Sequence, residues 1–332
     1  MSLKGKKVLI TGGSGFIGSH LVQQLLTEGC LVTVLVRPSS LGYAGWIDTF
    51  SPAEKEQLKI IRGDIRDSWT VLEAAKGQQI IFHLAALISI PYSYSVPEAY
   101  VDTNIKGTLN VLQSARVQGV EKTVITSTSE VYGTALSVPI TEDHPLQGQS
   151  PYSASKIGAD QLALSFWRSY GLPVTVIRPF NCYGPRQSTR AIIPTIIIQA
   201  LKNNGNIRLG SLKPTRDFTF VTDTARAFKL IAESKEAVGK VINIGNGFDV
   251  SIGELVEKIG KVMGKQLKVQ TDDQRLRPEK SEVFQLVSST KLAQSVLNWK
   301  ASTSLDVGLK EAAAWFSNAE NLKFYPDIEY RI

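Results

Sequence analysis

The sequence predicts an α/β protein in which a doubly wound parallel sheet is joined to a smaller C-terminal α/β lobe. Over about the first 180 residues, short apolar runs rich in β-branched residues alternate with segments of helical periodicity. A glycine-rich turn connects the first of these strands to the first helix. Beyond about residue 185 the alternation becomes less regular, which indicates a second lobe.

Composition and charge restrict the classes of function. The chain has 332 residues, of which 43% are hydrophobic and 20% charged, as in ordinary globular proteins. Its net charge of +7 suits an anionic ligand, but the basic residues form no cluster, so we expect no nucleic-acid partner. No apolar run approaches the roughly 18–20 residues of a membrane span, so we expect no membrane insertion.

Cysteine usage and the first residues of the chain bear on the compartment. Cys30 and Cys182 are too few for a disulfide framework and are not spaced as metal ligands. The opening segment MSLKGKKVLI has no signal-peptide core. We therefore expect a cytoplasmic protein without a bound metal.

The first strand and helix predict a dinucleotide-binding turn. Residues 6–11 form a short apolar run, and the sequence GGSGFIG follows at 12–18. In a Rossmann fold such glycines let the backbone approach a pyrophosphate, whose charge is favoured at the helix N-terminus. We expect the contacts to come from Gly12, Gly15, Phe16, Ile17 and Gly18. The alternative is a tight turn with no ligand.

The end of the second strand, at 31–37, bears on the choice of cofactor. A Rossmann fold commonly places an acid there against the ribose 2′-hydroxyl, but this chain has Arg37, followed by Pro38 and Ser39. Arginine with a hydroxyl nearby suits a 2′-phosphate, so NADP is favoured over NAD. Alternatively, Arg37 stacks on adenine or faces solvent.

The next two strands supply further cofactor contacts. The run at 58–65 ends near Asp64 and Ile65, whose carboxylate and main-chain amide could read the adenine. The run at 80–87 predicts a buried strand. Its small and apolar residues Leu84, Ala85 and Ala86 would permit close approach of the cofactor.

Two polar residues in this region have different expected roles. His83 lies inside an apolar run, which is more typical of a buried core histidine than of a ligand. The helical pattern at 97–118 contains Asn104, which we expect to brace the backbone of the cofactor site.

The stretch from 126 to 156 predicts a proton-transfer site. TSTSEVYG supplies Thr128, Ser129 and Glu130 at the end of the strand at 120–128, where open α/β sheets bind ligands. PYSASK supplies Tyr152 and Lys156, which lie one turn apart on a predicted helix at 152–170. We expect the ammonium to lower the pKa of the phenol, so that Tyr152 acts as a base. The alternatives are an exposed Tyr–Lys pair and a structural carboxylate.

We divide the chain into two lobes. Residues 1–180 form the dinucleotide-binding domain, and residues 218–247 return to it with a seventh strand at 241–247. Residues 181–217 and 248–332 form the second lobe. A ligand should bind in the crevice between them.

The motifs GGSGFIG, HLAA, TSTSEVYG, YSASK and RPFNCYGPR, together with Asp64, resemble the extended short-chain dehydrogenase/reductase family. The resemblance covers essentially the whole chain. It implies a Rossmann domain with a nucleotide-sugar lobe, a tightly held NAD(P) and a nucleotide-diphosphate sugar as substrate. It also implies a homodimer packed through the helices at 97–118 and 152–170.

Within that family the chain resembles the sugar-nucleotide 4,6-dehydratases, which carry a glutamate at the position of Glu130. RPEKSEV at 277–283 and RAIIPTII at 190–197 look similar to UDP-N-acetylglucosamine 4,6-dehydratases of the legionaminic-acid type, whereas TSTSEVYG and VRPSS resemble GDP-mannose 4,6-dehydratases. The rival functions are a UDP-sugar 4-epimerase, which would need no base at C5, and a catalytically idle NADP-binding protein.

The resemblance also implies roles for single residues. Tyr152 would take the proton of the C4 hydroxyl, Thr128 would orient O4, and Glu130 would remove the C5 proton. Ser129 stands where related dehydratases have an aspartic acid that protonates the departing C6 hydroxyl, so Glu130 is favoured as both base and acid. The nucleotide-sugar contacts would come from Asn181, Arg186, Arg216, Arg277 and Glu282.

Overall fold

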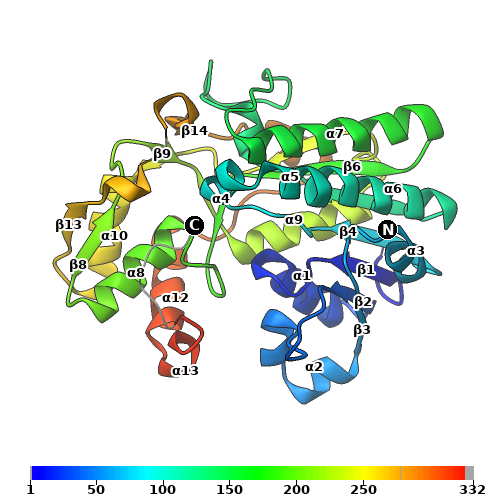
Figure 1. The fold of residues 1–332 in the computed structure, drawn as a ribbon, viewed down its shortest axis with the longest axis horizontal. Coiled ribbons are helices and arrows are strands. Elements are labelled where there is room, and N and C mark those ends of the chain that lie inside the picture. The colour runs from blue at the N-terminus through cyan, green and yellow to red at the C-terminus, as the bar shows by residue number, and fades with distance from the viewer. Residues whose placement is uncertain (1, 277, 326–332) are drawn as a thin grey trace.

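The computed structural model describes residues 2–276 and 278–325, and its first lobe is built on one parallel sheet (Figure 1). The seven strands, in spatial order, are β11 (Val241–Ile244), β6 (Val174–Pro179), β5 (Lys122–Thr126), β4 (Ile80–His83), β1 (Lys7–Thr11), β2 (Leu31–Val36) and β3 (Leu58–Arg62). All six neighbouring pairs run parallel. The predicted doubly wound sheet is confirmed, including the strand expected at 241–247.

Helices cover both faces of this sheet, because successive strand residues point to opposite sides. Val8 and Ile10 of β1 belong to the apolar core under α1 (Phe16–Thr27) and α9 (Val221–Glu233). Leu9, between them, belongs to the core on the other side. That second core is formed with α3 (Ser68–Ala75), α6 (Gly107–Val117) and α7 (Pro151–Tyr170).

The helix expected at 97–118 is divided into three parts. It begins as α5 (Pro97–Tyr100), continues as a π-helical segment η2 (Val101–Lys106), and ends as α6. The wider π turn occurs at Asn104, the residue expected to brace the cofactor site. Single π turns inside α-helices are frequent at functional sites.

The second lobe encloses its own apolar core, made chiefly by three helices. α8 (Ile192–Lys202), α10 (Ile252–Met263) and α12 (Leu305–Ser317) supply most of its buried side chains. Short strands pair around it: β7 (Asn181–Tyr183) with β10 (Phe218–Phe220), β8 (Asn206–Leu209) with β13 (Lys268–Thr271), and β9 (Thr215–Arg216) with β12 (Val250–Ser251) and β14 (Gln285–Leu286). The remaining helices are η1 (Gly45–Thr49), α2 (Pro52–Glu56), α4 (Ile90–Ser95), η3 (Ser129–Tyr132), η4 (Asp273–Arg275), η5 (Glu279–Ser281), α11 (Lys291–Leu297) and α13 (Ala319–Leu322).

One segment lies in a different lobe from the one we assigned to it. Ala293 and Leu297 of α11, and Trp299 after it, belong to the core of the first lobe rather than the second. They pack there because α11 lies against β11, the last strand of the sheet, and against α9. The chain therefore returns to the first lobe twice.

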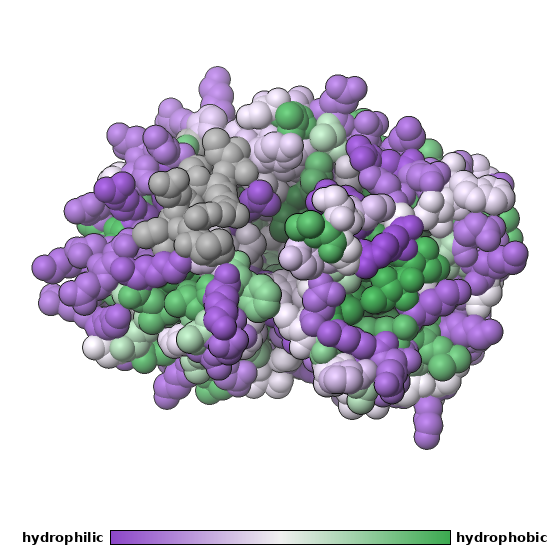
Figure 2. All heavy atoms as spheres, turned by 60° about the horizontal axis from the view of Figure 1, so that its bottom comes forward, coloured by the Kyte–Doolittle hydropathy of each residue, from purple (hydrophilic) through white to green (hydrophobic). Residues whose placement is uncertain are grey.

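One face of the molecule carries a mixture of polar and apolar side chains (Figure 2). Figure 2 shows hydrophilic side chains spread across the face in view, with apolar residues gathered in patches between them. Within residues 2–276 and 278–325, no helix is long and apolar enough to span a membrane.

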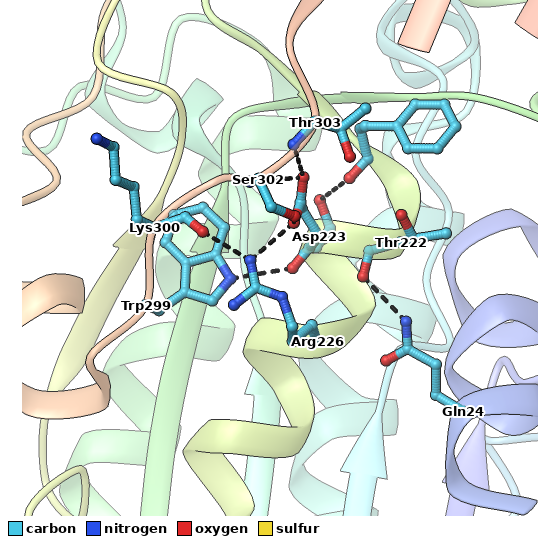
Figure 3. Close-up of polar contacts among 10 residues, drawn as sticks. Gln24, Thr222, Asp223, Arg226, Trp299, Lys300, Ser302 and Thr303 are labelled. Atoms are coloured by element: carbon cyan, nitrogen blue, oxygen red, sulfur yellow. Dashed lines mark hydrogen bonds and ion pairs between the residues drawn. The ribbon is translucent and has the colours of Figure 1, made fainter. Parts of the chain in front are cut away.

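Asp223 fixes the second of these returns to the first lobe (Figure 3). Its carboxylate accepts hydrogen bonds from the amide of Thr303 at 2.9 Å and from the hydroxyl of Ser302 at 2.6 Å, and it pairs with Arg226 at 2.7 Å. The indole of Trp299 donates to the main-chain oxygen of the same aspartate at 3.1 Å. Asp223 thus binds the segment after α11 to the first turn of α9.

We expect Asp223→Asn to lower the free energy of unfolding by about 2 kcal/mol or more, since it removes charge-assisted hydrogen bonds from a buried acceptor. Burial acts to raise the pKa of Asp223, but the bonds from Ser302, Arg226 and Thr303 outweigh it and hold that pKa below its usual value. The stabilisation is therefore present above the unfolded-state pKa and declines as the pH falls through the lower folded-state value. Urea unfolding at neutral and acidic pH measures both effects.

Asp306→Asn is the matched control. Asp306 pairs with Lys258 at 2.9 Å, but its side chain is 66% exposed, so its loss should cost about 0.5 kcal/mol or less. Equal costs for the two variants would contradict a structural role particular to Asp223.

Candidate active site

A cavity of about 1010 Å³ lies at the carboxyl edge of the sheet. It begins at β1 and β4, where the strand order reverses, which is where open α/β sheets bind ligands. Residues that follow β1, β2, β3, β4, β5 and β6 all line it, together with the loop after β7. Its size suits a dinucleotide with part of a second ligand.

The glycine turn after β1 fits close contact with a phosphate group. Gly12 has a φ of +74°, and a Cβ there would lie 2.6 Å from the nitrogen of Ala85. A Cβ on Gly18 would lie 2.2 Å from the oxygen of Gly12. Helix α1 begins at Phe16 with Gly15 as its N-cap and no capping side chain, so its first N–H groups are available to an anion at this wall of the cavity.

The ends of β2 and β3 form the next part of the wall. Arg37 and Ser39 both line the cavity. Asp64 and Ile65 line it as well. The carboxylate of Asp64 pairs with Arg66 at 2.7 Å, and the hydrogen bonds from Arg66 lower its pKa.

At the end of β4, one residue belongs to the protein core and the next three line the cavity. Leu84, Ala85 and Ala86 line the cavity. His83 is buried and bonds the hydroxyls of Thr11 at 2.7 Å and Thr108 at 3.0 Å. Burial lowers its pKa to about 3, so the ring is neutral. The interpretation of His83 as a core residue is confirmed.

Asn104 braces this wall from behind. Its side-chain oxygen accepts from the amide of Leu87 at 2.9 Å, and its side-chain nitrogen donates to the oxygen of Leu87 at 3.0 Å. The same nitrogen donates to Ser155 of α7 at 2.9 Å. Asn104 is 1% exposed and is not part of the cavity lining, so the structure gives it the bracing role and no direct cofactor contact.

Four of the five residues expected to carry the chemistry line the same part of the cavity: Thr128, Glu130, Tyr152 and Lys156. Thr128 caps the short helix η3, accepting from the amide of Glu130 at 3.2 Å, and also hydrogen-bonds the phenol of Tyr152. Tyr152 and Lys156 lie on the first turns of α7, which is started by the capping box of Ser150 with Ser153 and by Pro151 at its first position.

The ionisation of Tyr152 differs from the prediction. Burial raises the pKa of Tyr152 above its usual value, and the charge of Glu130 raises it further, while the bond from Thr128 lowers it. Lys156 directs its ammonium at the carbonyl of Thr126 at 2.6 Å. Burial lowers the pKa of Lys156 to about 8. The prediction that Lys156 lowers the pKa of Tyr152 in the protein alone is therefore wrong, because loss of hydration opposes both charges.

Ser129 lies outside the cavity. Its side chain is 3% exposed and is not part of the lining, although its neighbours Thr128 and Glu130 are. This placement gives Ser129 no direct route to a bound ligand.

The loop after β6 and β7 forms the opposite wall. Asn181 lines the cavity as expected. Gln187 and Arg190, which the sequence interpretation missed, line it too. The side-chain oxygens of Asn181 and Gln187 are buried without a partner among the described residues, which leaves two acceptors at this wall. Gln187 lies in a loop that contains Gly184 and Pro185, and Arg190 begins the run RAIIPTII, but neither pattern marks a ligand contact.

Arg186 contacts the first lobe instead of the cavity. Its guanidinium donates to the hydroxyl of Ser19 at 3.2 Å and lies 5.4 Å over the ring of Phe50. Beside it, His20 bonds the oxygen of Pro185 at 3.1 Å. The structure thus places Arg186 between the lobes, away from the expected substrate contact.

Two other expected substrate residues pair with each other. Arg216 and Glu282 form an ion pair at 3.5 Å, and neither belongs to the cavity lining. The prediction for Arg277 lies outside the described residues.

An aromatic cluster joins the cofactor wall to the second lobe. It consists of Trp46, Trp315, Phe324 and Tyr325, with ring centroids 5.1–6.2 Å from Trp46. The amide of Trp46 donates to the oxygen of Ser14 in the glycine turn at 3.0 Å. The loop that borders the cavity at Tyr43 and Gly45 is therefore held against the turn from the far lobe.

Within the described part of the chain both cysteines are free, and no cluster of potential metal ligands occurs. Cys30 and Cys182 are unbridged, and burial raises the pKa of their thiols to about 11 and about 12. No group of three or more potential ligands could hold a metal ion in residues 2–276 and 278–325.

Comparison with known proteins agrees with this geometry. Residues 9–312 match the model of the family described as GDP-mannose 4,6 dehydratase. The chain belongs to the nucleotide-sugar enzymes of the extended short-chain dehydrogenase/reductase family. It is 31% identical to a putative UDP-glucose 4-epimerase of Methanocaldococcus jannaschii, covering 94% of this chain and 98% of that one.

Two further relatives are named as dehydratases. The dTDP-D-glucose 4,6-dehydratase of Mus musculus is 30% identical, covering 96% of this chain and 91% of that one. The crystal structure of the dTDP-glucose 4,6-dehydratase DesIV from Streptomyces venezuelae, with NAD and TYD bound, is 31% identical with a TM-score of 0.85, covering 97% and 99% of the two chains. The chain is thus an enzyme of a family that contains both dehydratases and epimerases.

Proposed function

We propose that this protein is an NAD(P)-dependent nucleotide-sugar 4,6-dehydratase whose substrate is UDP-N-acetylglucosamine. The observation that carries the proposal is the presence of Glu130 in the cavity wall beside Thr128, Tyr152 and Lys156. The product would be the 4-keto-6-deoxy sugar, formed by oxidation at C4, loss of water across C5 and C6, and reduction at C6.

Tyr152 is the base for oxidation at C4 in this proposal. It accepts the proton of the C4 hydroxyl, and Thr128, which hydrogen-bonds the phenol, orients O4. A bound nicotinamide would accept the hydride from C4 and return it to C6, and the positive charge of its oxidised ring would favour the phenolate that burial disfavours. The Lys156 ammonium, which lines the same wall, would hold the ribose.

Glu130 is the base for the elimination. Once C4 is a ketone the C5 proton is acidified, and a carboxylate on this wall can remove it. Because Ser129 is buried outside the cavity, we assign Glu130 the protonation of the departing C6 hydroxyl as well.

Two rival functions are less well supported. A 4-epimerase, as one relative is named, inverts C4 and has no use for a base at C5, so Glu130 favours dehydration. A catalytically idle NADP-binding protein has no use for a tyrosine and a lysine directed at the cofactor cavity. The choice of sugar rests on the resemblance of RPEKSEV and RAIIPTII to UDP-N-acetylglucosamine enzymes.

We further propose NADP as the preferred cofactor. The end of β2 presents Arg37 and Ser39 to the cavity and no carboxylate of its own. The solved relative with NAD bound shows that the fold also serves the unphosphorylated dinucleotide, so the preference depends on these side chains.

A homodimer through α6 and α7 and a cytoplasmic location stay predictions. The dimer is supported by exposed apolar side chains on these helices, among them Val117 at 66% and Tyr170 at 55%. Sedimentation velocity at micromolar concentration measures it, and a monomer would exclude it.

The reaction itself is tested by incubating the protein with UDP-N-acetylglucosamine, UDP-glucose and GDP-mannose and following the products by mass. We expect loss of one water from UDP-N-acetylglucosamine, with the other two sugars converted more slowly. A product of unchanged mass would identify an epimerase. If none of the three sugars is converted, the result would favour the catalytically idle NADP-binding protein.

Glu130→Gln should separate oxidation from elimination. We expect the variant to accumulate reduced cofactor when substrate is added, while dehydration falls by about 10²-fold or more, since a general base is lost. Absorbance of the reduced nicotinamide and product mass measure the two steps. Glu98→Gln, at an exposed position on α5, is the control and should behave as the wild type. Normal dehydration by Glu130→Gln would mean that the C5 base lies elsewhere.

Arg37→Ala tests the cofactor preference. We expect the dissociation constant for NADP to rise about 10-fold or more, the equivalent of one charge-assisted hydrogen bond, and that for NAD to change little. Fluorescence titration with each dinucleotide measures this, with the exposed Arg168→Ala on α7 as the control. Equal weakening for both dinucleotides would contradict a 2′-phosphate contact.

A further inference from the structure

A buried ion pair lies directly behind the catalytic wall. Asp160 of α7 is 0% exposed and Arg178 of β6 is 2% exposed. Two guanidinium nitrogens of Arg178 donate to one carboxylate oxygen, at 3.0 and 3.1 Å. Neither residue has a predicted role, although Arg178 begins the motif RPFNCYGPR, because the partner of each is set by a distant segment.

The pair and its partners connect five elements of the first lobe, namely α7, β6, the end of β5, η3 and β11. The same oxygen of Asp160 accepts from the hydroxyl of Ser127, at the end of β5, at 2.7 Å. Arg178 donates to the hydroxyl of Tyr132 in η3 at 2.9 Å, and its guanidinium lies 4.9 Å over that ring. The Tyr132 hydroxyl in turn donates to Asn243 of β11 at 2.7 Å.

Three of the catalytic groups, Thr128, Glu130 and Lys156, lie next to these contacts in the chain. Ser127 lies between Thr128 and Thr126, whose carbonyl receives the ammonium of Lys156. Tyr132 ends the short helix that carries Glu130. Asp160 follows Lys156 by one turn of α7. The strand, the short helix and the long helix that form the catalytic wall therefore meet at one buried pair.

We propose that Asp160 and Arg178 are positioning residues that hold the Thr128–Glu130 segment in register with the Tyr152–Lys156 helix and maintain the charge of Lys156. Neither residue lines the cavity. The inference rests on the shared oxidation at C4, and it applies equally whether the product is a dehydrated sugar or an epimer.

The free-energy cost of burying both charges of the pair supports a functional role. Buried ion pairs are often no more stabilising than apolar residues of the same size, since both charges lose hydration. The second carboxylate oxygen of Asp160 is also buried and has no partner among the described residues. A site selected for stability alone would not leave a carboxylate oxygen unsatisfied.

The charges around Lys156 also support a functional role for Asp160. Burial lowers the pKa of Lys156 to about 8, and the carboxylate of Asp160 opposes that fall. The other ionisable groups that face this region are His83 from β4, Tyr100 from α5, Glu130 from η3, Tyr152 from α7 and Arg178 from β6. His83 is neutral and both phenols have raised pKa values, so Asp160 is the anion on the Lys156 helix that keeps the ammonium protonated.

The sign of the pH effect follows from these contacts. The Lys156 ammonium is present below its folded-state pKa of about 8 and is lost as the pH rises through it. Removing the charge of Asp160 leaves Arg178 as an unbalanced cation in the same network, which favours neutral Lys156. The alkaline limb of the activity profile should therefore move to lower pH.

The test is the pH dependence of substrate-induced cofactor reduction in Asp160→Asn, using a sugar that the wild type oxidises. We expect the alkaline limb of the pH–rate profile to move to lower pH by about one unit. Above that limb, the rate should be about 10-fold lower than in the wild type. The double variant Asp160→Asn/Arg178→Met, which removes both charges, should move the limb back toward the wild-type position while the rate stays low. An unchanged limb in the single variant would overturn the inference.

Two milder variants keep the test valid if Asp160→Asn fails to fold. Ser127→Ala and Tyr132→Phe each remove one hydrogen bond to the pair and keep both charges. They should slow cofactor reduction while leaving the alkaline limb in place. Wild-type rates in both variants would overturn the positioning role.

A binding measurement separates this inference from the identity of the sugar. Because Lys156 lines the cofactor cavity, dinucleotide affinity in the absence of sugar should weaken above the same pH limb, and at lower pH in Asp160→Asn. A wild type that oxidises none of the sugars would refute the proposed function, and this binding profile would still decide the inference. Identical binding profiles for wild type and variant would refute it.

Discussion

The seven strands of the sheet all run in one direction, and this constraint gathers the functional groups of the protein. The carboxyl ends of β1, β5 and β6 meet at one edge, where they deliver the glycine turn, Glu130 and Asn181 to one cavity. Tyr152 and Lys156 come from a helix, which the sheet alone does not place. Contacts between α7 and the end of β5 supply that placement, through Lys156 to Thr126 and Asp160 to Ser127.

Those contacts involve charges inside a region with little water, and this explains the unusual ionisation. Lys156 is easier to deprotonate than a free lysine and Tyr152 harder than a free tyrosine, because each charged form loses hydration. In the ligand-free protein Tyr152 is therefore neutral, whereas Lys156 is an ammonium below its pKa of about 8. A cationic nicotinamide ring would change that balance, so the base would be generated where and when the cofactor is bound.

The site residues that are set by a local sequence pattern could be predicted from the sequence. Thr128 and Glu130 could be placed because an apolar strand ends just before them. Tyr152 and Lys156 could be placed because residues four apart lie on one face of a helix. Side-chain contacts and pKa values that depend on distant segments could not be predicted from the sequence. Arg186 contacts Ser19, far away in sequence, and the ionisation of Tyr152 depends on burial that only the packed structure reveals.

The aromatic cluster around Trp46 has a consequence for the order in which the protein can be assembled. Trp46 is made early in synthesis, whereas Phe324 and Tyr325, on which it packs, are nearly 280 residues later. A nascent chain that has folded its glycine turn therefore still lacks the packing that holds the loop over that turn. This packing must await the synthesis of Phe324 and Tyr325, so a dinucleotide that binds to the turn before then would meet a less restrained loop.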